Sequence, residues 1–167
     1  MEDTQVAEMV QTLALEPGMR VLEIGARGAY HRGLLASYVG ECGRVTTIDL
    51  HTEITHPLLS PFQSVRVGDA EDVFSNNPTR ACYDRIISTQ GVQYIPFGWI
   101  DLLAPGGRVI VELRRPLAAV VLLLYKHDDG KGAGGAIMPI ESSFRNPRSL
   151  NPPRNPGPML CEIQDAV

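Results

Sequence analysis

The sequence predicts an α/β domain with a mostly parallel sheet and an antiparallel hairpin at one edge. An apolar run over residues 19–24 leads into a glycine-containing turn, and a second apolar run, about twenty residues later, ends in Asp49. Further apolar runs of strand length alternate with helical segments as far as residue 113. Beyond that point two apolar runs follow each other with only a turn between them, which predicts the hairpin.

The first elements follow from spacing and from breakers. Residues 4–15 carry apolar side chains at helical spacing, with Asp3 or Thr4 as the N-cap, and Pro17-Gly18 ends the pattern. The nearly continuous apolar run at 19–24 is typical of a parallel strand that is covered on both faces. Residues 29–39 predict a helix whose inward residues are Leu34, Leu35 and Tyr38.

The remaining elements are shorter or interrupted. Pro57 and Pro61 weaken the second crossover helix expected over residues 50–63. Strands are expected at 44–48, 64–67, 84–88, 108–113, 117–127 and 135–140, and a short helix at 96–103. The proline- and asparagine-rich segment 145–158 has no periodicity and predicts an extended or disordered tail, so the expected organisation is a domain at 1–144 and a tail at 145–167.

Composition excludes several classes of protein. The formal net charge of -4 argues against binding to a nucleic-acid backbone, and no run reaches the ~18 apolar residues of a membrane span. The sequence has three widely separated cysteines, no metal-ligand spacing and no signal-peptide pattern, which predicts a cytoplasmic protein with reduced thiols and no metal site. The four histidines are scattered and are expected to face solvent.

Chemically useful groups follow four of the predicted strands. These groups are the loop Gly25, Ala26, Arg27 and Gly28, then Asp49, then Gly68-Asp69, and then Ser88-Thr89-Gln90. Carboxyl ends of parallel strands meet at one edge of the sheet, where ligands bind. A glycine turn admits close backbone approach, and a carboxylate after the second strand can accept hydrogen bonds from both ribose hydroxyls.

Two adenosine-containing cofactors suit this Rossmann-like arrangement. A dinucleotide requires the register G-x-G-x-x-G, and the glycines at 25, 28 and 33 do not provide it. Glu23 stands two residues before Gly25 and resembles the acidic-x-Gly pattern of class I methyltransferases instead. S-adenosylmethionine carries a sulfonium cation and no phosphate, so an acidic pocket suits it better, and an oxidoreductase is the weaker alternative.

Several blocks in order resemble the protein-L-isoaspartate O-methyltransferase family. They are L-x-L-E-P-G-M-R-V-L-E-I-G (13–25), V-T-T-I-D (45–49), V-G-D (67–69), Y-D-R-I-I-S-T (83–89), I-P-x-x-W (95–99) and L-A-P-G-G-R (103–108). The resemblance covers roughly residues 4–143. It implies a Rossmann-like class I methyltransferase fold, S-adenosylmethionine as cofactor, and methyl transfer to a carboxylate of a protein or peptide in protein modification or repair.

The resemblance also assigns roles to residues. It implies cofactor contacts for the loop that starts at Glu23, for the ribose acid Asp49 with Leu50, for Gly68, Asp69 and Ala70, and for Thr89. The substrate-side hydroxyl of the family corresponds at best to Thr4, without the proline that follows in the family.

The chain departs from the family pattern at two loop positions. Where the family has E-I-G-x-G-x-G-Y, this sequence has Arg27 and Ala29 in place of two glycines, and it starts about fifty residues later than the family does. The leading hypothesis is a methyltransferase of isoaspartyl type. The alternative is a catalytically impaired or non-enzymatic relative with the same fold.

Overall fold

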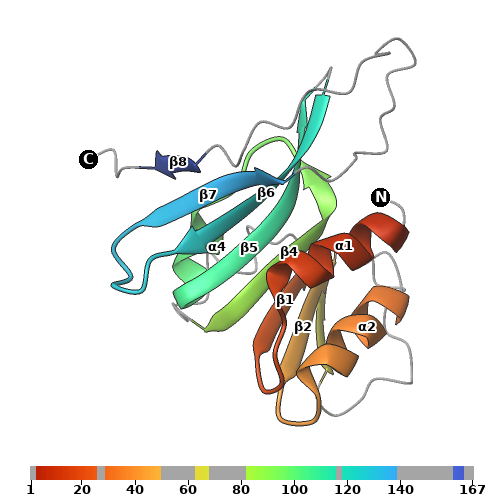
Figure 1. Cartoon of the computed structure of the whole chain (residues 1–167). Helices are drawn as coiled ribbons and strands as arrows, with labels where there is room; N and C mark the ends of the chain where they lie inside the picture. Colours follow the sequence, from red (N-terminus) through yellow and green to blue (C-terminus); the bar gives the residue numbers. More distant parts are fainter. Residues whose placement is uncertain are drawn as a thin grey trace.

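A computed structural model describes residues 3–25, 29–49, 63–67, 82–115, 118–138 and 160–163. These residues form one sheet with helices on both of its faces (Figure 1). The elements in chain order are α1 (Asp3–Leu13), β1 (Arg20–Ile24), α2 (Ala29–Val39), β2 (Arg44–Asp49), β3 (Gln63–Val67), β4 (Tyr83–Val92), α4 (Phe97–Leu102), β5 (Leu103–Arg115), β6 (Ala118–Lys126), β7 (Ala133–Met138) and β8 (Leu160–Ile163).

The sheet is mostly parallel with antiparallel strands at one edge, as the sequence predicts. The order of the described strands is β3-β2-β1-β4-β5-β6-β7-β8. The strands from β3 to β5 are parallel, and β6, β7 and β8 continue the sheet in antiparallel pairing. The predicted α/β class with an antiparallel edge is therefore confirmed, and the strand order reverses between β1 and β4.

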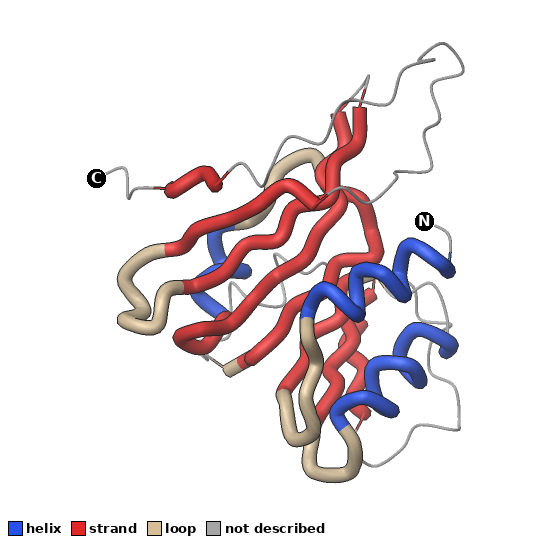
Figure 2. The backbone as a smooth tube through the Cα atoms, viewed as in Figure 1, coloured by secondary structure: helices blue, strands red, loops and turns tan. Residues whose placement is uncertain are grey.

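Two apolar layers bury the sheet. Helices α1 and α2 lie on one face and α4 lies on the other (Figure 2). Because side chains alternate along a strand, Val21 packs under α1 and α2 while its neighbour Leu22 packs on the side of α4. Trp99 and Leu102 anchor α4 in this second layer, so even a helix of six residues is held by burial of two large side chains.

Helix α2 has the predicted bounds but a different inward face. His31, Leu35 and Val39 are buried at i, i+4 and i+8, whereas Tyr38 is 41% exposed. The predicted inward position of Tyr38 is wrong, and so is the predicted solvent exposure of His31. The helix is rotated so that the stripe ending in Val39, not the one ending in Tyr38, faces the sheet.

Helix α1 ends two residues before the predicted boundary. Ala14 takes a φ of 50°, a left-handed conformation that stops the helix, and Arg85 Nε donates a hydrogen bond of 2.7 Å to the carbonyl oxygen of Leu13. A buried guanidinium on β4 therefore satisfies one of the last carbonyls of α1 and fixes the end of this helix against the sheet.

Strands β4 and β5 extend further than predicted. Both strands include polar or glycine residues, which sequence patterns assign to loops. Pairing with a neighbouring strand holds these residues in an extended conformation. The predicted hairpin is confirmed as β6 and β7. Strand β8 lies in the segment predicted to be a tail and pairs with β7.

Some sequence predictions lie outside the described residues. They are the weak helix at 50–63, apart from its last residue, which begins β3, and the segment 145–158. The division of the chain at residue 144 stays a prediction. Cys42 and Cys82 are free thiols, and none of the described helices is long and apolar enough to cross a membrane.

The opposite, amino edge of the sheet is held by an ion pair. Arg20 at the start of β1 donates from Nη2 to Asp84 Oδ1 at 2.9 Å and from its backbone nitrogen to Asp84 Oδ2 at 2.8 Å. The hydrogen bond with Arg20 holds the pKa of Asp84 below its ordinary value. Both side chains are partly exposed, so this pair is a modest contributor to stability.

Replacement of Leu35 by alanine should lower the free energy of unfolding by about 2–5 kcal/mol, because the side chain is 1% exposed and leaves a cavity under α2. Tyr38→Ala on the same helix is the control and should change it by less than about 1 kcal/mol. Urea denaturation followed by circular dichroism measures both. Equal losses for the two variants would contradict the observed orientation of α2.

Candidate functional site

The carboxyl ends of β1, β2 and β4 meet where the strand order reverses. This reversal point is the place where ligands bind in open α/β sheets. Glu23 and Gly25 come from β1 and the turn after it, Asp49 is the last residue of β2, and Thr89 lies near the end of β4. Four residues that the sequence singled out from three different strands are thus brought to one edge.

Glu23 is a carboxyl group enclosed within the protein. It has no exposed surface, and Thr47, its partner in the β1–β2 register, donates from Oγ1 to Glu23 Oε2 at 2.8 Å. The second oxygen, Oε1, is buried and has no hydrogen-bond partner among the described residues. A buried acceptor without a partner is costly in a folded protein, so this atom points to a ligand.

Burial raises the pKa of Glu23 to about 7, and the charge of Asp49 adds to the rise. The hydrogen bond from Thr47 and the charge of Arg32 on α2 act in the opposite direction. Removing the carboxyl group from water disfavours its ionised form, and a nearby cation restores that form. Glu23 is therefore poised to ionise when a positive group binds beside it.

Gly25 makes the turn after β1 possible. Its φ is +80°, and a side chain there would place its Cβ atom 2.4 Å from the Cβ atom of Gln90. The turn is tied down on both sides, because Gly25 N donates to the carbonyl oxygen of Ile48 at 2.9 Å and Thr89 Oγ1 donates to the carbonyl oxygen of Gly25. Only glycine satisfies both the backbone conformation and the close approach of β4.

The end of β4 leaves the regular ladder. Ser88 pairs with Val111 and Val92 pairs with Leu113, so β4 contains two more residues than β5 between these pairs. Ser88 Oγ donates to the carbonyl oxygen of Gln90 at 2.7 Å and holds this irregular segment in shape. Irregularities of this kind re-aim side chains beside functional sites.

The structure places the predicted site residues as follows. Glu23, Gly25, Asp49 and Thr89 lie at the same edge. Thr89 is 1% exposed, and its hydroxyl supports the glycine turn. Thr4 lies in the first turn of α1, with its side chain outside the described part. The remaining predicted positions lie outside the described residues: Ala26, Arg27, Gly28, Leu50, Gly68, Asp69 and Ala70.

Two further residues contribute to the site, and the sequence patterns above do not single them out. Thr47 could have been found from its spacing. It stands two residues before Asp49, just as Glu23 stands two residues before Gly25. Two parallel strands that end at the same level bring these two residues side by side. Arg32 is 2% exposed on α2, and no pattern in the sequence marks it, because its effect on Glu23 depends on how the helix is rotated.

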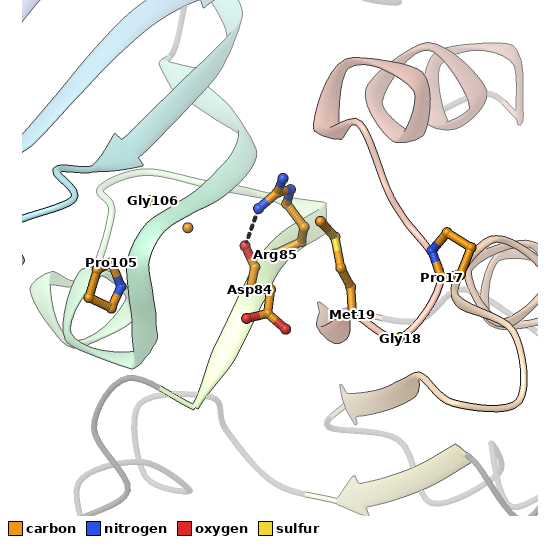
Figure 3. A pocket seen from close by; sticks show the side chains of 8 residues that line it. Pro17, Gly18, Met19, Asp84, Arg85, Pro105 and Gly106 are labelled. Atoms are coloured by element: carbon orange, nitrogen blue, oxygen red, sulfur yellow. Dashed lines mark hydrogen bonds between the residues drawn. The ribbon is translucent and has the colours of Figure 1, made fainter.

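Two cavities lie away from this edge. A hollow of about 360 Å³ opens at the amino ends of β1, β4 and β5 (Figure 3), lined by Pro17, Gly18, Met19, Asp84, Arg85, Pro105, Gly106 and Gly107. A second, of about 240 Å³, lies between α4 and the β6–β7 turn. Neither cavity is lined by a predicted site residue, so the evidence for the site is the side chains at the carboxyl edge and not a cavity. In the described part of the chain, no cluster of three His, Cys, Asp or Glu residues could hold a metal ion.

A profile of the family described as protein-L-isoaspartate(D-aspartate) O-methyltransferase matches residues 2–140 of this chain. The chain belongs to this family. It is 31% identical to the protein-L-isoaspartate O-methyltransferase of Methanopyrus kandleri over 159 residues, covering 86% of this chain and 69% of that protein. It is 30% identical to the enzyme of the same name from Hyperthermus butylicus, covering 80% of this chain and 61% of that protein.

Solved structures show the same fold. A protein-L-isoaspartate O-methyltransferase aligns with a TM-score of 0.68 at 29% identity over 80% of this chain and 43% of that one. A Plasmodium falciparum structure, described as a putative enzyme of this kind in complex with S-adenosyl-L-homocysteine, has a TM-score of 0.62 at 15% identity, with coverage of 80% and 65%. This chain therefore spans only part of the isoaspartate methyltransferases that it resembles.

The unusual pKa of Glu23 should be visible in the pH dependence of stability. Between pH 4.5 and about 7 the native state retains a proton on Glu23 that the unfolded chain has lost. The free energy of unfolding should therefore fall as pH rises through this window, by on the order of 3 kcal/mol. Glu23→Gln should remove that fall and make the protein more stable at pH 8.

Denaturation series at pH 4.5, 6, 7 and 8 measure how the free energy of unfolding changes with pH. Asp84→Asn is the control, because Arg20 lowers the pKa of Asp84 and its titration lies below this window. A Glu23→Gln variant with the same slope as the parent protein would contradict the buried, proton-retaining state of Glu23.

Proposed function

We propose that this chain is an S-adenosylmethionine-dependent O-methyltransferase that transfers a methyl group to a carboxylate of a protein or peptide, of isoaspartyl type. Membership of the family supports the reaction class. The observation that carries the proposal in this chain is the buried Glu23 carboxyl, with one unpartnered oxygen, beside the glycine turn.

The described residues fit a cofactor with cationic groups and an adenosine. Glu23 offers an unpartnered acceptor whose ionisation a cation would favour. Asp49, 8% exposed on the same edge, suits the ribose hydroxyls, and Gly25 lets the backbone approach closely. The proposed adenine contacts at Gly68, Asp69 and Ala70, and the loop contacts at Ala26, Arg27, Gly28 and Leu50, stay predictions.

When bound, S-adenosylmethionine supplies a methyl group that an ionised carboxylate attacks, so that a C–O bond forms, the S–CH3 bond breaks with its electron pair left on sulfur, and a methyl ester and S-adenosylhomocysteine result. An acceptor carboxylate is already ionised at pH 7 and requires no general base. The chain contributes by holding the two reactants in line and by excluding water, and good alignment supplies up to ~7–11 kcal/mol of the barrier.

A catalytically impaired relative is the competing proposal. Its support is Arg27, which stands where the family pattern has glycine and gives the predicted cofactor loop a positive charge. If this cation opposes the cofactor, Arg27→Gly should increase cofactor affinity at least about tenfold, or about 1.4 kcal/mol. Equal affinity of the parent protein and the variant in calorimetric titration would remove that support.

The cofactor site is tested by titration with S-adenosylhomocysteine. The parent protein should bind, and Gly25→Ala should weaken binding at least about tenfold, because the added Cβ atom displaces Gln90. Gly18→Ala is a matched control, since Gly18 also has a positive φ, of +88°, but has no neighbouring atom within 4 Å of the added Cβ. Absence of heat with the parent protein at millimolar ligand would contradict the proposal.

Methyl transfer to an isoaspartyl peptide is tested separately with radiolabelled S-adenosylmethionine. The peptide is expected to incorporate the radiolabelled methyl group. Base hydrolysis should then release the label as methanol, as it does from a methyl ester. Binding of S-adenosylhomocysteine without any incorporation would favour the impaired relative. The cytoplasmic location also stays a prediction.

A further inference from the structure

An ion pair fixes a guanidinium at the carboxyl end of β5. Arg114 donates from Nε to Glu112 Oε1 and from Nη2 to Glu112 Oε2, both at 3.1 Å. The Glu112 side chain is 4% exposed, whereas that of Arg114 is 38% exposed. A buried carboxylate that accepts two parallel hydrogen bonds locks the plane and direction of a guanidinium.

Gly91 brings this guanidinium over the end of β4. A side chain at Gly91 would place its Cβ atom 2.2 Å from Arg114 Nε and 2.4 Å from its Cδ. The stem of Arg114 therefore lies directly against the backbone of Gly91, in the irregular segment where β4 has two residues more than β5. Neither the ion pair nor the close contact takes part in the proposed cofactor site.

The same segment forms a wall of the proposed cofactor site. Gln90, next to Gly91, is the residue whose side chain closes over Gly25. The glycine turn and Arg114 thus contact two consecutive residues of β4 from the two sides. Glu23 and Asp49 belong to β1 and β2, so the cofactor would occupy that half of the carboxyl edge. The half over β4 and β5 is left for the methyl acceptor.

Glu112 uses only two of the five N–H groups of Arg114. Among the described residues, Arg114 has no hydrogen-bond partner beyond Glu112, and its side chain as a whole is partly exposed. A guanidinium is always charged and matches the geometry of a carboxylate. The burial of Glu112 accounts for the ion pair, but it does not account for a guanidinium side chain that stays partly exposed.

We propose that Arg114, positioned by Glu112 and seated on Gly91, binds the acceptor carboxylate of the peptide substrate. This inference rests on the proposed function, since the acceptor is the isoaspartyl carboxylate of that reaction. One carboxylate oxygen accepts from Arg114, which leaves the other oxygen available for the methyl group. Arg114 is then a specificity residue and Glu112 a positioning residue.

The test compares two fluorescent peptides that differ only in the acceptor group, an isoaspartyl carboxylate or its carboxamide. Fluorescence anisotropy measures their affinities with and without S-adenosylhomocysteine. The parent protein should bind the carboxylate peptide at least about tenfold more tightly than the carboxamide. Arg114→Lys keeps the charge but not the planar fork and should reduce this preference.

Removal of Arg114 alone would leave Glu112 buried without a partner and could unfold the chain. The double variant Glu112→Gln, Arg114→Gln avoids this, because two amides can bond to each other. It should bind both peptides equally while its affinity for S-adenosylhomocysteine stays that of the parent protein. In the methyl-transfer assay its KM for the peptide should rise at least tenfold, with a smaller change in kcat.

The matched control is Arg20→Gln, Asp84→Asn, which removes an arginine–carboxylate pair from the amino edge. This control should keep the carboxylate preference. The inference is overturned if the parent protein has no preference for the carboxylate peptide, or if the Arg114 double variant retains the preference. Failure to bind S-adenosylhomocysteine with the peptide preference intact would contradict the cofactor proposal and leave the role of Arg114 standing.

Discussion

A hydrogen bond between two adjacent strands organises the carboxyl edge of this sheet. Thr47 on β2 donates to Glu23 on β1, in a register where both side chains lie on the face covered by α2. The carboxyl group is thereby enclosed by the sheet and the helix, and only one of its two oxygens is satisfied by the described residues. Burial of an acid in this way opposes folding when the acid is ionised. A buried acid with a raised pKa at a strand end is therefore a candidate for ligand binding.

The rest of the edge depends on that placement. Strand β1 must end directly after Glu23 for the turn at Gly25 to follow, and the turn is held because β4 supplies both Thr89 and the covering side chain of Gln90. The irregular end of β4 allows one segment to serve two neighbours, the glycine turn on one side and Arg114 on the other. Rigid strands thus position both halves of the proposed site, which is the arrangement that favours alignment of two reactants.

Much of this arrangement could be predicted from the sequence. Apolar runs gave the parallel strands and the hairpin, and the convergence of carboxyl ends placed Glu23, Gly25, Asp49 and Thr89 together. These inferences succeed because strand periodicity is a local property of the chain, and because alternation of strands with helices is typical of a parallel sheet. The bounds of α2 were also correct, since Ala29–Val39 ends at a glycine.

Features set by tertiary contacts could not be predicted in the same way. The rotation of α2, which buries His31 and exposes Tyr38, depends on how the helix meets the sheet. The lengths of β4 and β5 and the pairing of β8 depend on neighbouring strands rather than on local propensity. Arg114 and Gly91 stand far apart in the sequence, and nothing in either segment indicates that they touch.

The central claim is that Glu23 is a buried acid whose ionisation is coupled to cofactor binding. The most direct measurement is the titration of the Glu23 side-chain carboxyl carbon by NMR, with and without S-adenosylhomocysteine. We expect a pKa of about 7 in the free protein, because burial opposes the charge, and a lower pKa in the complex, because the ligand ammonium favours it. A pKa near 4.5 in the free protein, or one that the ligand leaves unchanged, would show that the ionisation of Glu23 is not coupled to cofactor binding.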